Sequence, residues 1–452
     1  MALLLRNVRC VVSCDKRDTV YEKVDIFCKD GVIKAIGKDL DVGAEQVINC
    51  TELLCYPGLV NTHHHFYQIF SRNLPQTQGL RLFDWLTVLY DIWRRLDPEA
   101  ISLSSKCALA LLMKSGCTTA FDHHYVFPGD SSLGLLDAQF AAAEELGTRF
   151  YASRGSMNLS KKDGGLPPDS VAQTTERILK DSMAAVEKYH DPSFGSMRQV
   201  ALAPCSPFSA SRDLYRESAK LARSLGVRLH THLCETKEEE YYTETAFKMR
   251  PLEYMQSLDF VGRDVWFAHG IWFNDDELRV LRDTGTAVTH CPTSNMKLAS
   301  GVARIPDMMQ MGIPVSLGVD GSASNDGSDM IAEMRMAYLL SRVTYGNHAP
   351  DAYDWLKAAT VGGARTLGRD DIGSVEVGKC ADMFLVDKRR LDIVGAAYSP
   401  KTMLAAVGLS GGVDYTIVNG RVTVENGRLV HTDERELFEQ SHQKIKRYLD
   451  VL

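Results

Sequence analysis

Histidine and acidic residues recur along the chain at spacings that suit a metal site. His63, His64 and His65 follow the segment CYPGLVNT. Residues two apart in an extended strand project from the same face, so His63 and His65 can bind one ion while His64 points away. Two imidazoles at this spacing suit Zn²⁺ or Fe²⁺ better than Mg²⁺ or Ca²⁺. Taken alone, the pair is also typical of a polar loop tip.

Three further segments supply residues of the same kind. His232 lies in LHTHL and is followed three residues later by Glu235, His269 lies in WFAHG, and Asp320 lies in LGVDGSAS. Histidine and aspartate side chains that become buried must be paired or bound to a ligand. A shared metal centre therefore explains these residues together better than four separate structural roles do.

The elements that must position these residues form a repeat. Eight apolar runs end in polar tips: CYPGLVNTHHH, CTTAFDHHY, TRFYASRGS, QVALAPCSP, VRLHTHLCE, DVWFAHGIW, TAVTHCPTSN and IPVSLGVDGSAS. Segments with helical periodicity lie between them, and LGLLDAQFAAAEELG and RDLYRESAKLARSLG end in glycine, as helices often do. The repeats predict a (β/α)₈ (TIM) barrel over residues 57–374, with its chemistry at the carboxyl ends of the strands. An open doubly wound sheet is disfavoured because no GxGxxG follows the first strand.

Both ends of the chain are rich in β-branched residues and turn signals. Asp-Gly at 30–31 and Asn-Gly at 419–420 and 426–427 are flanked by alternating apolar residues, which predicts β-hairpins. We therefore expect an α/β protein whose residues 1–56 and 375–452 form one small β-sandwich domain around the barrel. An amphipathic helix is predicted near 433–450.

Composition narrows the class of protein. The chain has 452 residues, 45% of them hydrophobic and 24% charged, which excludes a disordered protein. A net charge of −7 disfavours nucleic acids and anionic membranes as partners. No apolar run reaches the roughly 18 residues of a membrane span, and the first residues lack the features of a signal peptide. Eleven cysteines without a CxxC pair indicate reduced thiols and a cytoplasmic protein.

Four motifs together resemble the amidohydrolase superfamily, in its metal-dependent deaminase branch that acts on purines, cytosine and triazines. They are PGLVNTHHH, HTHLCET, AHG and GVDGSASND, and the resemblance covers essentially the whole chain. It implies that one metal, zinc or alternatively Fe²⁺, is held by His63, His65, His232 and Asp320.

The resemblance also implies catalytic roles. His269 would orient or activate the water on the metal, Glu235 would shuttle protons at the substrate's ring nitrogen, and Asp320 would take the water's proton. A bound divalent cation makes water a nucleophile at neutral pH, and a carboxyl group beside it can protonate the departing ammonia. The acidic run after Glu235, ETKEEEYYTE, is interpreted as the solvated start of a helix.

The fourth strand departs from the binuclear members of the superfamily. Its end, VALAPCSPFSAS, has no lysine to bridge two ions, so one metal is expected. Cys205 in this segment either ligates a second soft ion, lines the pocket or is a buried thiol. The other zinc deaminase architecture needs Pro-Cys-x-x-Cys, which this chain lacks.

Several residues are candidates for substrate binding. Gln68 and Trp85 resemble the guanine deaminase subset, although a surface position for Gln68 and a packing role for Trp85 are the alternatives. Arg154 has the geometry to donate to a ring carbonyl or to pair with a carboxylate. Tyr125 shares one side of the second strand with His123, opposite to His124, and is a candidate because this side can face inward. Cys205 completes the set if it lines the pocket.

The segments DHHYVFP, SRGSM and APCSPFS resemble bacterial 8-oxoguanine deaminases and, more loosely, triazine hydrolases. The arginine of typical guanine deaminases at strand four is absent, which favours an oxidised ring over guanine. The expected reaction is hydrolysis of the free base 8-oxoguanine to urate and ammonia. The alternatives are an s-triazine aminohydrolase or chlorohydrolase, a guanine or isoguanine deaminase, and a non-catalytic barrel. Relatives of this kind are commonly homo-oligomers, so a homo-oligomer is expected.

Overall fold

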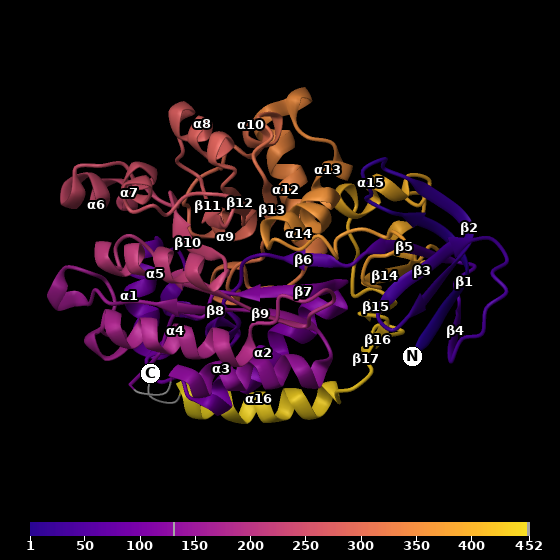
Figure 1. Cartoon of the computed structure of the whole chain (residues 1–452), viewed down its shortest axis with the longest axis horizontal. Helices are drawn as coiled ribbons and strands as arrows, with labels where there is room; N and C mark the ends of the chain where they lie inside the picture. The colour runs from indigo at the N-terminus through magenta and orange to yellow at the C-terminus, as the bar shows by residue number, and fades with distance from the viewer. Residues whose placement is uncertain (130–131, 450–452) are drawn as a thin grey trace.

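A computed structural model describes residues 1–129 and 132–449 and contains two sheets, one for each predicted part of the fold (Figure 1). One sheet has eight strands in the order β13-β12-β11-β10-β9-β8-β7-β6, and all of its neighbours are parallel. The other has nine strands drawn from both ends of the chain. The α/β fold class predicted from the sequence is confirmed.

The parallel sheet forms the barrel. Its strands are β6 (Leu59–Asn61), β7 (Cys117–Asp122), β8 (Arg149–Ser156), β9 (Arg198–Pro204), β10 (Leu229–Leu233), β11 (Val265–His269), β12 (Ala287–His290) and β13 (Val315–Leu317). The first and last strands also meet, because the backbone N–H of Thr62 donates to the carbonyl of Leu317 at 3.2 Å. Each of the eight predicted strands is present, and the barrel is nearly closed.

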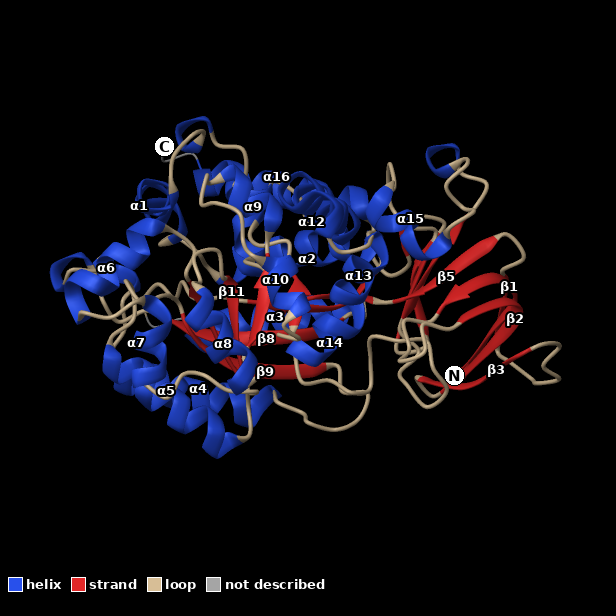
Figure 2. Ribbon diagram, turned by 90° about the horizontal axis from the view of Figure 1, so that it is seen from above, coloured by secondary structure: helices blue, strands red, loops and turns tan. Residues whose placement is uncertain are grey.

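Helices surround the barrel (Figure 2). They are α1 (Leu82–Trp93), α2 (Pro98–Lys114), α3 (Ser132–Leu146), α4 (Thr175–Tyr189), α5 (Arg212–Leu225), α6 (Lys237–Phe247), α7 (Pro251–Ser257), α8 (Asp275–Thr284), α9 (Pro292–Lys297), α10 (Ile305–Gln310), α11 (Ser322–Asn325), α12 (Met330–Tyr345), α13 (Ala352–Lys357) and α14 (Gly363–Thr366). The glycine ends predicted for two of them are observed: Gly147 and Gly226 follow α3 and α5 with φ of 73° and 69°. Such positive φ values suit glycine.

The nine-stranded sheet combines the two ends of the chain. Its strands are β1 (Ala2–Val12), β2 (Val20–Lys29), β3 (Val32–Gly37), β4 (Gln46–Asn49), β5 (Leu53–Pro57), β14 (Met383–Asp387), β15 (Tyr415–Val418), β16 (Arg421–Glu425) and β17 (Arg428–Leu429). The order β17-β16-β15-β14-β5-β1-β2-β3 places the antiparallel pair β5 and β14 at its centre.

The turns of this sheet match the sequence prediction. Both residues of the pairs at 30–31, 419–420 and 426–427 have positive φ, as a two-residue type I′ hairpin requires. The sheet also folds back on itself, because Ala381 N donates to Gly31 O at 2.8 Å and a β-bridge joins Val32 to Cys380. The predicted sandwich is thus formed by one continuous sheet that curves round, and the apolar residues of its strands pack together inside the curve. The domain limits at 56/57 and 374/375 stay a prediction.

A buried ion pair joins the two parts of the fold. Arg149, the first residue of β8, pairs with Asp382, which precedes β14, and Asp382 also accepts a hydrogen bond from Asn419 N at 2.6 Å. The remaining helices are α15 (Pro400–Ala406) and the predicted amphipathic helix α16 (Glu434–Leu449), which packs along α2. Lys444 of α16 binds Asp97 at 2.6 Å.

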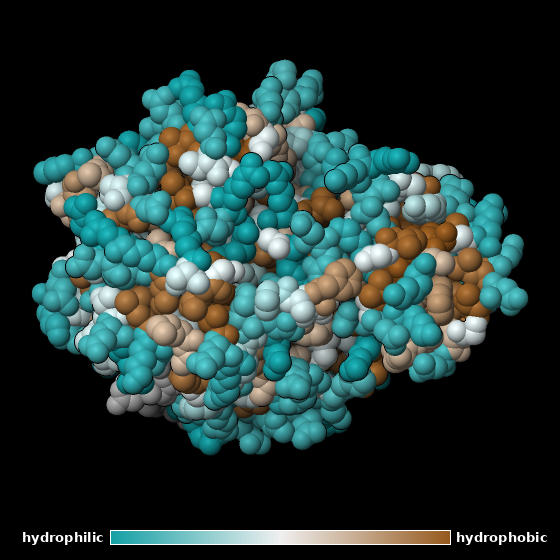
Figure 3. Space-filling view, in the orientation of Figure 1, coloured by the Kyte–Doolittle hydropathy of each residue, from teal (hydrophilic) through white to brown (hydrophobic). Residues whose placement is uncertain are grey.

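Many apolar side chains are buried, in clusters that belong to the barrel with its helices and to the nine-stranded sheet. The face in Figure 3 is largely hydrophilic, with several apolar patches, one of which lies at its right over the nine-stranded sheet. All eleven cysteines are free and ten of them are buried, which agrees with reduced thiols. Within the described residues, no helix combines the length and the apolar character that crossing a membrane requires.

Candidate metal centre and active site

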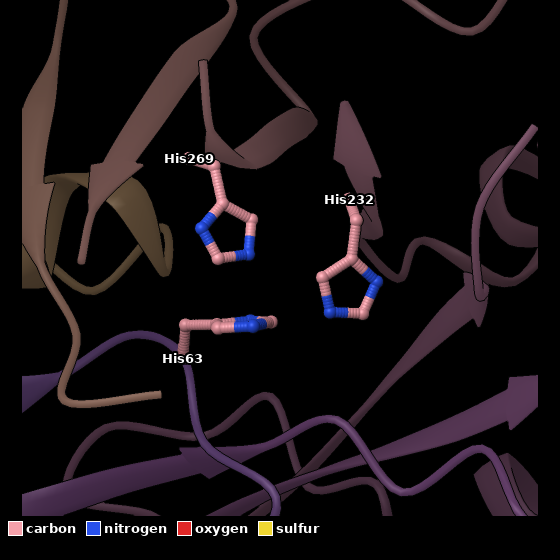
Figure 4. Close-up of side chains that lie close together, drawn as sticks. All are labelled: His63, His232 and His269. Carbon is pink, nitrogen blue, oxygen red and sulfur yellow. The ribbon is translucent and has the colours of Figure 1, made fainter. Parts of the chain in front are cut away.

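The candidate site lies at the carboxyl ends of the barrel strands. His63 and His65 follow β6, His232 lies in β10, His269 ends β11, and Asp320 follows β13. All five side chains are buried. Figure 4 shows the rings of His63, His232 and His269 turned towards one another across a common space. Residues from four different strand ends therefore meet at one point, as the sequence predicts.

Their donor atoms lie within reach of a single ion. His65 Nε2 lies 3.1 Å from His232 Nε2 and 3.2 Å from Asp320 Oδ1, while His63 Nε2 lies 3.4 Å from the same oxygen. Of the sets of three donors that lie within 4.8 Å of one another, two consist of these five residues alone: His63, His65 and Asp320, and His63, His232 and His269. Three imidazoles and one carboxylate are the donor set that the sequence resemblance implies.

The outer nitrogens of these rings are all engaged elsewhere. The Nδ1 atoms of His63, His65, His232 and His269 lie 2.7–2.8 Å from His230 Nε2, His123 O, Cys205 O and Asn295 Oδ1 respectively. Hydrogen bonds of this kind fix the orientation of an imidazole and leave its other nitrogen for a metal. The buried Nε2 of His63 has no hydrogen bond. The residues therefore fit a metal ion with nitrogen-rich ligands, such as zinc or Fe²⁺.

Electrostatics favours the protonation states that ligands need. Burial lowers the pKa of His63 well below its ordinary value and that of His232 to about 3, so both rings are neutral at pH 7. Burial alone would raise the pKa of Asp320, but the neighbouring His63 and His65 rings hold it well below its usual range. Neutral imidazoles and an ionised carboxylate are the metal-binding forms.

Asp320 is fixed on the side away from the histidines. Its Oδ2 accepts hydrogen bonds from the hydroxyls of Ser294 at 2.6 Å and Ser324 at 3.1 Å, and its Oδ1 accepts one from Gly321 N at 2.7 Å. Its backbone has a φ of +61°, and that of His269 is +74°. Non-glycine residues rarely adopt such conformations, and they are concentrated at functional sites.

Glu235 lies beside this cluster in the turn between β10 and α6. Its side chain is 5% exposed, and Oε2 lies 3.6 Å from His269 Nε2. Burial, with a contribution from the negative charge of Asp320, raises the pKa of Glu235 from 4.5 to about 8. A carboxyl group with this pKa holds a proton near neutral pH and can exchange it with a bound molecule.

A small cavity opens onto these residues. Its walls are formed by His65, Gln68, Leu82, Trp85, Leu86, Tyr125, Cys205, Ser206, Phe208, His232, Glu235, His269, Leu298, Asp320 and Ser324. Four of the five residues that the sequence suggested for substrate binding are among them: Gln68, Trp85, Tyr125 and Cys205.

The fifth, Arg154, is not part of this wall. Its guanidinium donates to Gln173 Oε1 at 2.6 Å, lies 3.5 Å from Asp181 Oδ2 and stacks on the ring of Phe127 at 3.8 Å. This arrangement corresponds to the alternative considered for it, an ion pair with a carboxylate. The partners come from α4 and the segment before it, which spacing along the sequence could not place beside β8.

The protonation state of the Cys205 thiol indicates whether Cys205 could bind a second metal ion. Burial raises the pKa of its thiol to about 12, so the thiol is neutral, and Sγ lies 3.9 Å from His232 Nδ1. Because metals bind the thiolate, this environment favours a pocket-lining thiol over a ligand of a second ion.

Gln68 is positioned by a close approach to the backbone after Asp320. A Cβ atom added to Gly321 would lie only 1.9 Å from Gln68 Oε1. Any side chain at position 321 would therefore push Gln68 out of its place in the cavity wall. The surface position considered for Gln68 does not occur, because this residue is 1% exposed.

Sequence reasoning missed several residues that support the site. Ser294 and Asn295 stand in the segment THCPTSN, and Ser324 stands in GVDGSASND, but nothing in their spacing showed which of them would reach Asp320 or His269. The acidic run after Glu235 is only partly solvated, because Glu239 within it is buried. Its position at the third residue of α6 was the available signal, since this position often reaches back to the preceding turn.

Comparison with known proteins places the chain among hydrolases. Residues 54–423 match the family model "Amidohydrolase family". The chain is 42% identical over 442 residues to the hydroxydechloroatrazine ethylaminohydrolase of Pseudomonas sp. (strain ADP), covering 94% of this chain and 92% of that protein. It is 46% identical over 377 residues to the 8-oxoguanine deaminase of Pseudomonas aeruginosa, covering 83% of each.

A solved structure agrees with these matches. The atrazine chlorohydrolase TrzN from Arthrobacter aurescens TC1, complexed with zinc, superposes with a TM-score of 0.94 at 31% identity, covering 98% of this chain and 100% of that one. Together with the buried histidine cluster, these likenesses identify the class of enzyme: the chain belongs to the amidohydrolase family.

Proposed function

We propose that this enzyme is a zinc-dependent aminohydrolase that removes an amino group from a free heterocyclic base, with 8-oxoguanine as the first choice of substrate. The single observation that carries the proposal is the convergence of the Nε2 atoms of His63, His65 and His232 and of Asp320 Oδ1 beside Glu235 at the wall of a cavity. The reaction would convert 8-oxoguanine and water to urate and ammonia.

His63, His65, His232 and Asp320 would hold one metal ion. Such an ion supplies Lewis acidity that lowers the pKa of water from about 15.7 towards about 7. His269 Nε2 faces the same space and is suited to orient the attacking water. Because Asn295 accepts a hydrogen bond from His269 Nδ1, the Nε2 atom of the neutral ring is left as an acceptor.

Proton transfer would fall to the two carboxyl groups. Asp320 is ionised and can accept the proton that water loses on attack at the C–NH₂ carbon. Glu235 can give its proton to the ring nitrogen and afterwards help to protonate the departing amine. The step balances: a C–O bond to water forms and the C–NH₂ bond breaks, one of water's two protons leaves with the amine as ammonia, and the other replaces on Glu235 the proton that stays on the ring nitrogen of the product.

The cavity suits a flat ring with a polar edge. Leu82, Leu86 and Leu298 supply apolar walls. Gln68 Oε1 and Trp85 Nε1 are buried and have no hydrogen-bond partner in the described protein. A buried acceptor and a buried donor without partners are costly unless a ligand satisfies them. A lactam edge, which offers N–H beside C=O, has the complementary groups and occurs in 8-oxoguanine.

A second candidate is hydrolysis of an alkylamino group from a hydroxylated s-triazine. The 42% identity to a triazine aminohydrolase extends over 94% of this chain, which is a longer match than that to the 8-oxoguanine deaminase. Hydroxylated triazines also present alternating N–H and C=O groups. Guanine and isoguanine are further alternatives within the purines. A homo-oligomeric state stays a prediction.

The metal-dependent reaction is tested by elemental analysis of the purified protein and of a His63→Ala variant. We expect close to one transition-metal ion per wild-type chain, mostly zinc, and a variant with little metal and at least about 100-fold lower turnover. His442→Ala, which changes an exposed histidine, serves as the control and should retain both. A wild-type protein without bound metal, or a His63→Ala protein with full turnover, would disprove the proposal.

The substrate is tested by ammonia and alkylamine release from a panel of rings. The panel comprises 8-oxoguanine, guanine, isoguanine, cytosine and hydroxyatrazine, each compared by kcat/KM. We expect 8-oxoguanine to give the highest value by at least about tenfold, which corresponds to about 1.4 kcal/mol of transition-state binding. A preference for hydroxyatrazine would replace the purine assignment by the triazine one.

A further inference from the structure

Glu239 carries a buried carboxyl group to which the proposed reaction gives no role. It is 1% exposed, and no Lys or Arg among the described residues forms an ion pair with it. Its two oxygens instead accept hydrogen bonds from consecutive backbone amides: Oε1 from Cys234 N at 2.9 Å and Oε2 from Glu235 N at 3.0 Å. The carboxyl group of Glu239 therefore binds the backbone N–H of Glu235, the residue proposed to transfer the proton.

This contact differs from ordinary helix capping. Thr236 is the N-cap of α6 and accepts a hydrogen bond from Glu239 N at 3.3 Å. In a capping box the acidic residue at this position binds the backbone N–H of the N-cap itself. Glu239 reaches past the cap to the two residues before it, where Cys234 has a φ of +54°. It stabilises a turn, rather than only the end of a helix.

The other side of the same turn is held by the segment that follows His269. The carbonyl of Leu233 accepts from Gly270 N at 3.1 Å, and the carbonyl of Cys234 accepts from Ile271 N at 2.8 Å and Trp272 N at 3.0 Å. The turn at residues 233–235 is thus held on both sides: Glu239 binds its amides, and the backbone N–H groups of residues 270–272 bind its carbonyls. As a result, the turns that carry Glu235 and His269 are locked together.

We propose that Glu239 is a positioning residue that holds the Glu235 carboxyl group against His269 and the reacting ring. This inference rests on the proposed function, in which Glu235 transfers the proton. Two adjacent N–H donors require two acceptor oxygens, which the carboxyl group of Glu239 supplies. Glutamine offers one oxygen and turns an NH₂ group towards the second N–H, so it cannot replace Glu239.

The test is a double-mutant cycle on the zinc-loaded enzyme, with wild type, Glu235→Gln, Glu239→Gln and the double variant. We expect Glu239→Gln to keep its zinc and a KM within about threefold of wild type, while kcat falls about 10- to 100-fold. In the Glu235→Gln background the same substitution should lower the residual kcat by less than about twofold. Such non-additivity shows that Glu239 acts through Glu235.

Glu238→Gln is the matched control. This neighbour in the same helical turn has a side chain 41% exposed and binds Arg81 at the surface, so its kcat should stay within about twofold of wild type. An equal loss of kcat when Glu239 is changed in both backgrounds, or loss of zinc in Glu239→Gln, overturns the positioning role and leaves the reaction intact. Full activity of Glu235→Gln instead overturns the proton-transfer role proposed for Glu235.

A second variant guards against a Glu239→Gln protein that does not fold. Glu239→Asp keeps both carboxyl oxygens but is one methylene shorter, so it cannot reach both amides from the same helix position. We expect the zinc-loaded Asp variant to lose at least about fivefold in kcat with little change in KM, and the loss to vanish in the Glu235→Gln background. Wild-type kcat in this variant contradicts the proposal.

Discussion

Each imidazole of the candidate metal centre has two separate tasks for its two nitrogens. Nε2 faces the centre, and Nδ1 is bound by a neighbouring ring, carbonyl or amide. Asp320 shows the same division, because Oδ1 faces the histidines and Oδ2 is occupied by serine hydroxyls. The protein thus fixes the orientation of every ligand before an ion arrives, which limits the reorganisation that binding requires.

Substitution of Ser294 tests this division. Ser294→Ala removes the shorter of the two hydroxyl contacts to Asp320 Oδ2, which frees the carboxylate to rotate. We expect a 10- to 100-fold loss in zinc affinity or in kcat, as is typical for residues that support metal ligands. Competition with a chelator and steady-state kinetics measure the two quantities.

Ser105→Ala is the control for this prediction. Ser105 is a buried serine on α2 whose hydroxyl has no hydrogen bond in the described structure. Its removal should change neither zinc affinity nor kcat. Equal behaviour of the Ser294 and Ser105 variants would show that the contact to Asp320 is dispensable.

The positions of the candidate ligands could be predicted from the sequence. His63 and His65 alternate with His64 in the extended segment directly after β6, and the family motifs point to the remaining candidates. The place of Arg154 could not be predicted, because its partners Gln173 and Asp181 come from a different part of the chain. The spacing of residues along the sequence does not show which distant residues become neighbours in the fold.

At the scale of elements, the loops that follow the barrel strands are tied to one another. Glu333 of α12 accepts hydrogen bonds from Thr293 N at 3.0 Å, Thr293 Oγ1 at 2.6 Å and Asn325 Nδ2 at 2.9 Å. It therefore joins the loop that carries Ser294 to the loop that carries Ser324. Burial raises the pKa of Glu333 from 4.5 to about 7.

This raised pKa predicts a pH dependence of stability. Between about pH 4.5 and pH 7 the folded chain keeps a proton on Glu333 that the unfolded chain has lost. The contribution of Glu333 to the free energy of unfolding therefore falls as pH rises through this window, by on the order of 3 kcal/mol at most. Below this window both states are protonated, and above it the loss is complete.

A Glu333→Gln variant isolates this contribution. We expect it to be less stable than wild type at pH 5, because one of the carboxyl group's acceptor sites is lost. The difference in free energy of unfolding should shrink by about 2 kcal/mol between pH 5 and pH 8, since only wild type must bury a charge at the higher pH. Denaturant titrations at both pH values measure it, and a difference that grows with pH would contradict the assignment.

Most elements could be predicted from the sequence, because eight polar tips mark eight strand ends and three Gly-containing turns mark hairpins. The acidic start of α6 is the exception. Its composition is typical of a solvated helix, yet Glu239 turns inward to bind amides at 234 and 235. Helical periodicity predicts which face is apolar, but it does not show where a polar side chain finds backbone donors.

For the whole molecule, the ion pair between Arg149 and Asp382 connects the barrel to the nine-stranded sheet. Both side chains are buried. Removing one partner of a buried pair leaves an uncompensated charge, so Arg149→Met should lower the free energy of unfolding by about 3–5 kcal/mol. Denaturant unfolding measures the loss, and kcat per folded molecule should be unchanged because the active site lies at the opposite end of the strands.

Arg389→Met provides the comparison for a surface pair. Arg389 is 67% exposed and pairs with Asp387 at the end of β14. Exposed pairs contribute about 0–1 kcal/mol, so this variant should unfold almost as wild type does. If Arg149→Met lowers the free energy of unfolding by no more than Arg389→Met does, the buried pair does not stabilise the contact between the barrel and the nine-stranded sheet.

The central pairing of the nine-stranded sheet has a consequence for biosynthesis. Pro57 of β5 lies opposite Met383 of β14, so all eight barrel strands are translated between these two neighbouring strands. At about 5–20 residues per second, the ribosome needs tens of seconds to deliver β14 after β5. During that interval the edge of β5 is unpaired, and the newborn chain offers an apolar strand to chaperones or to another nascent copy.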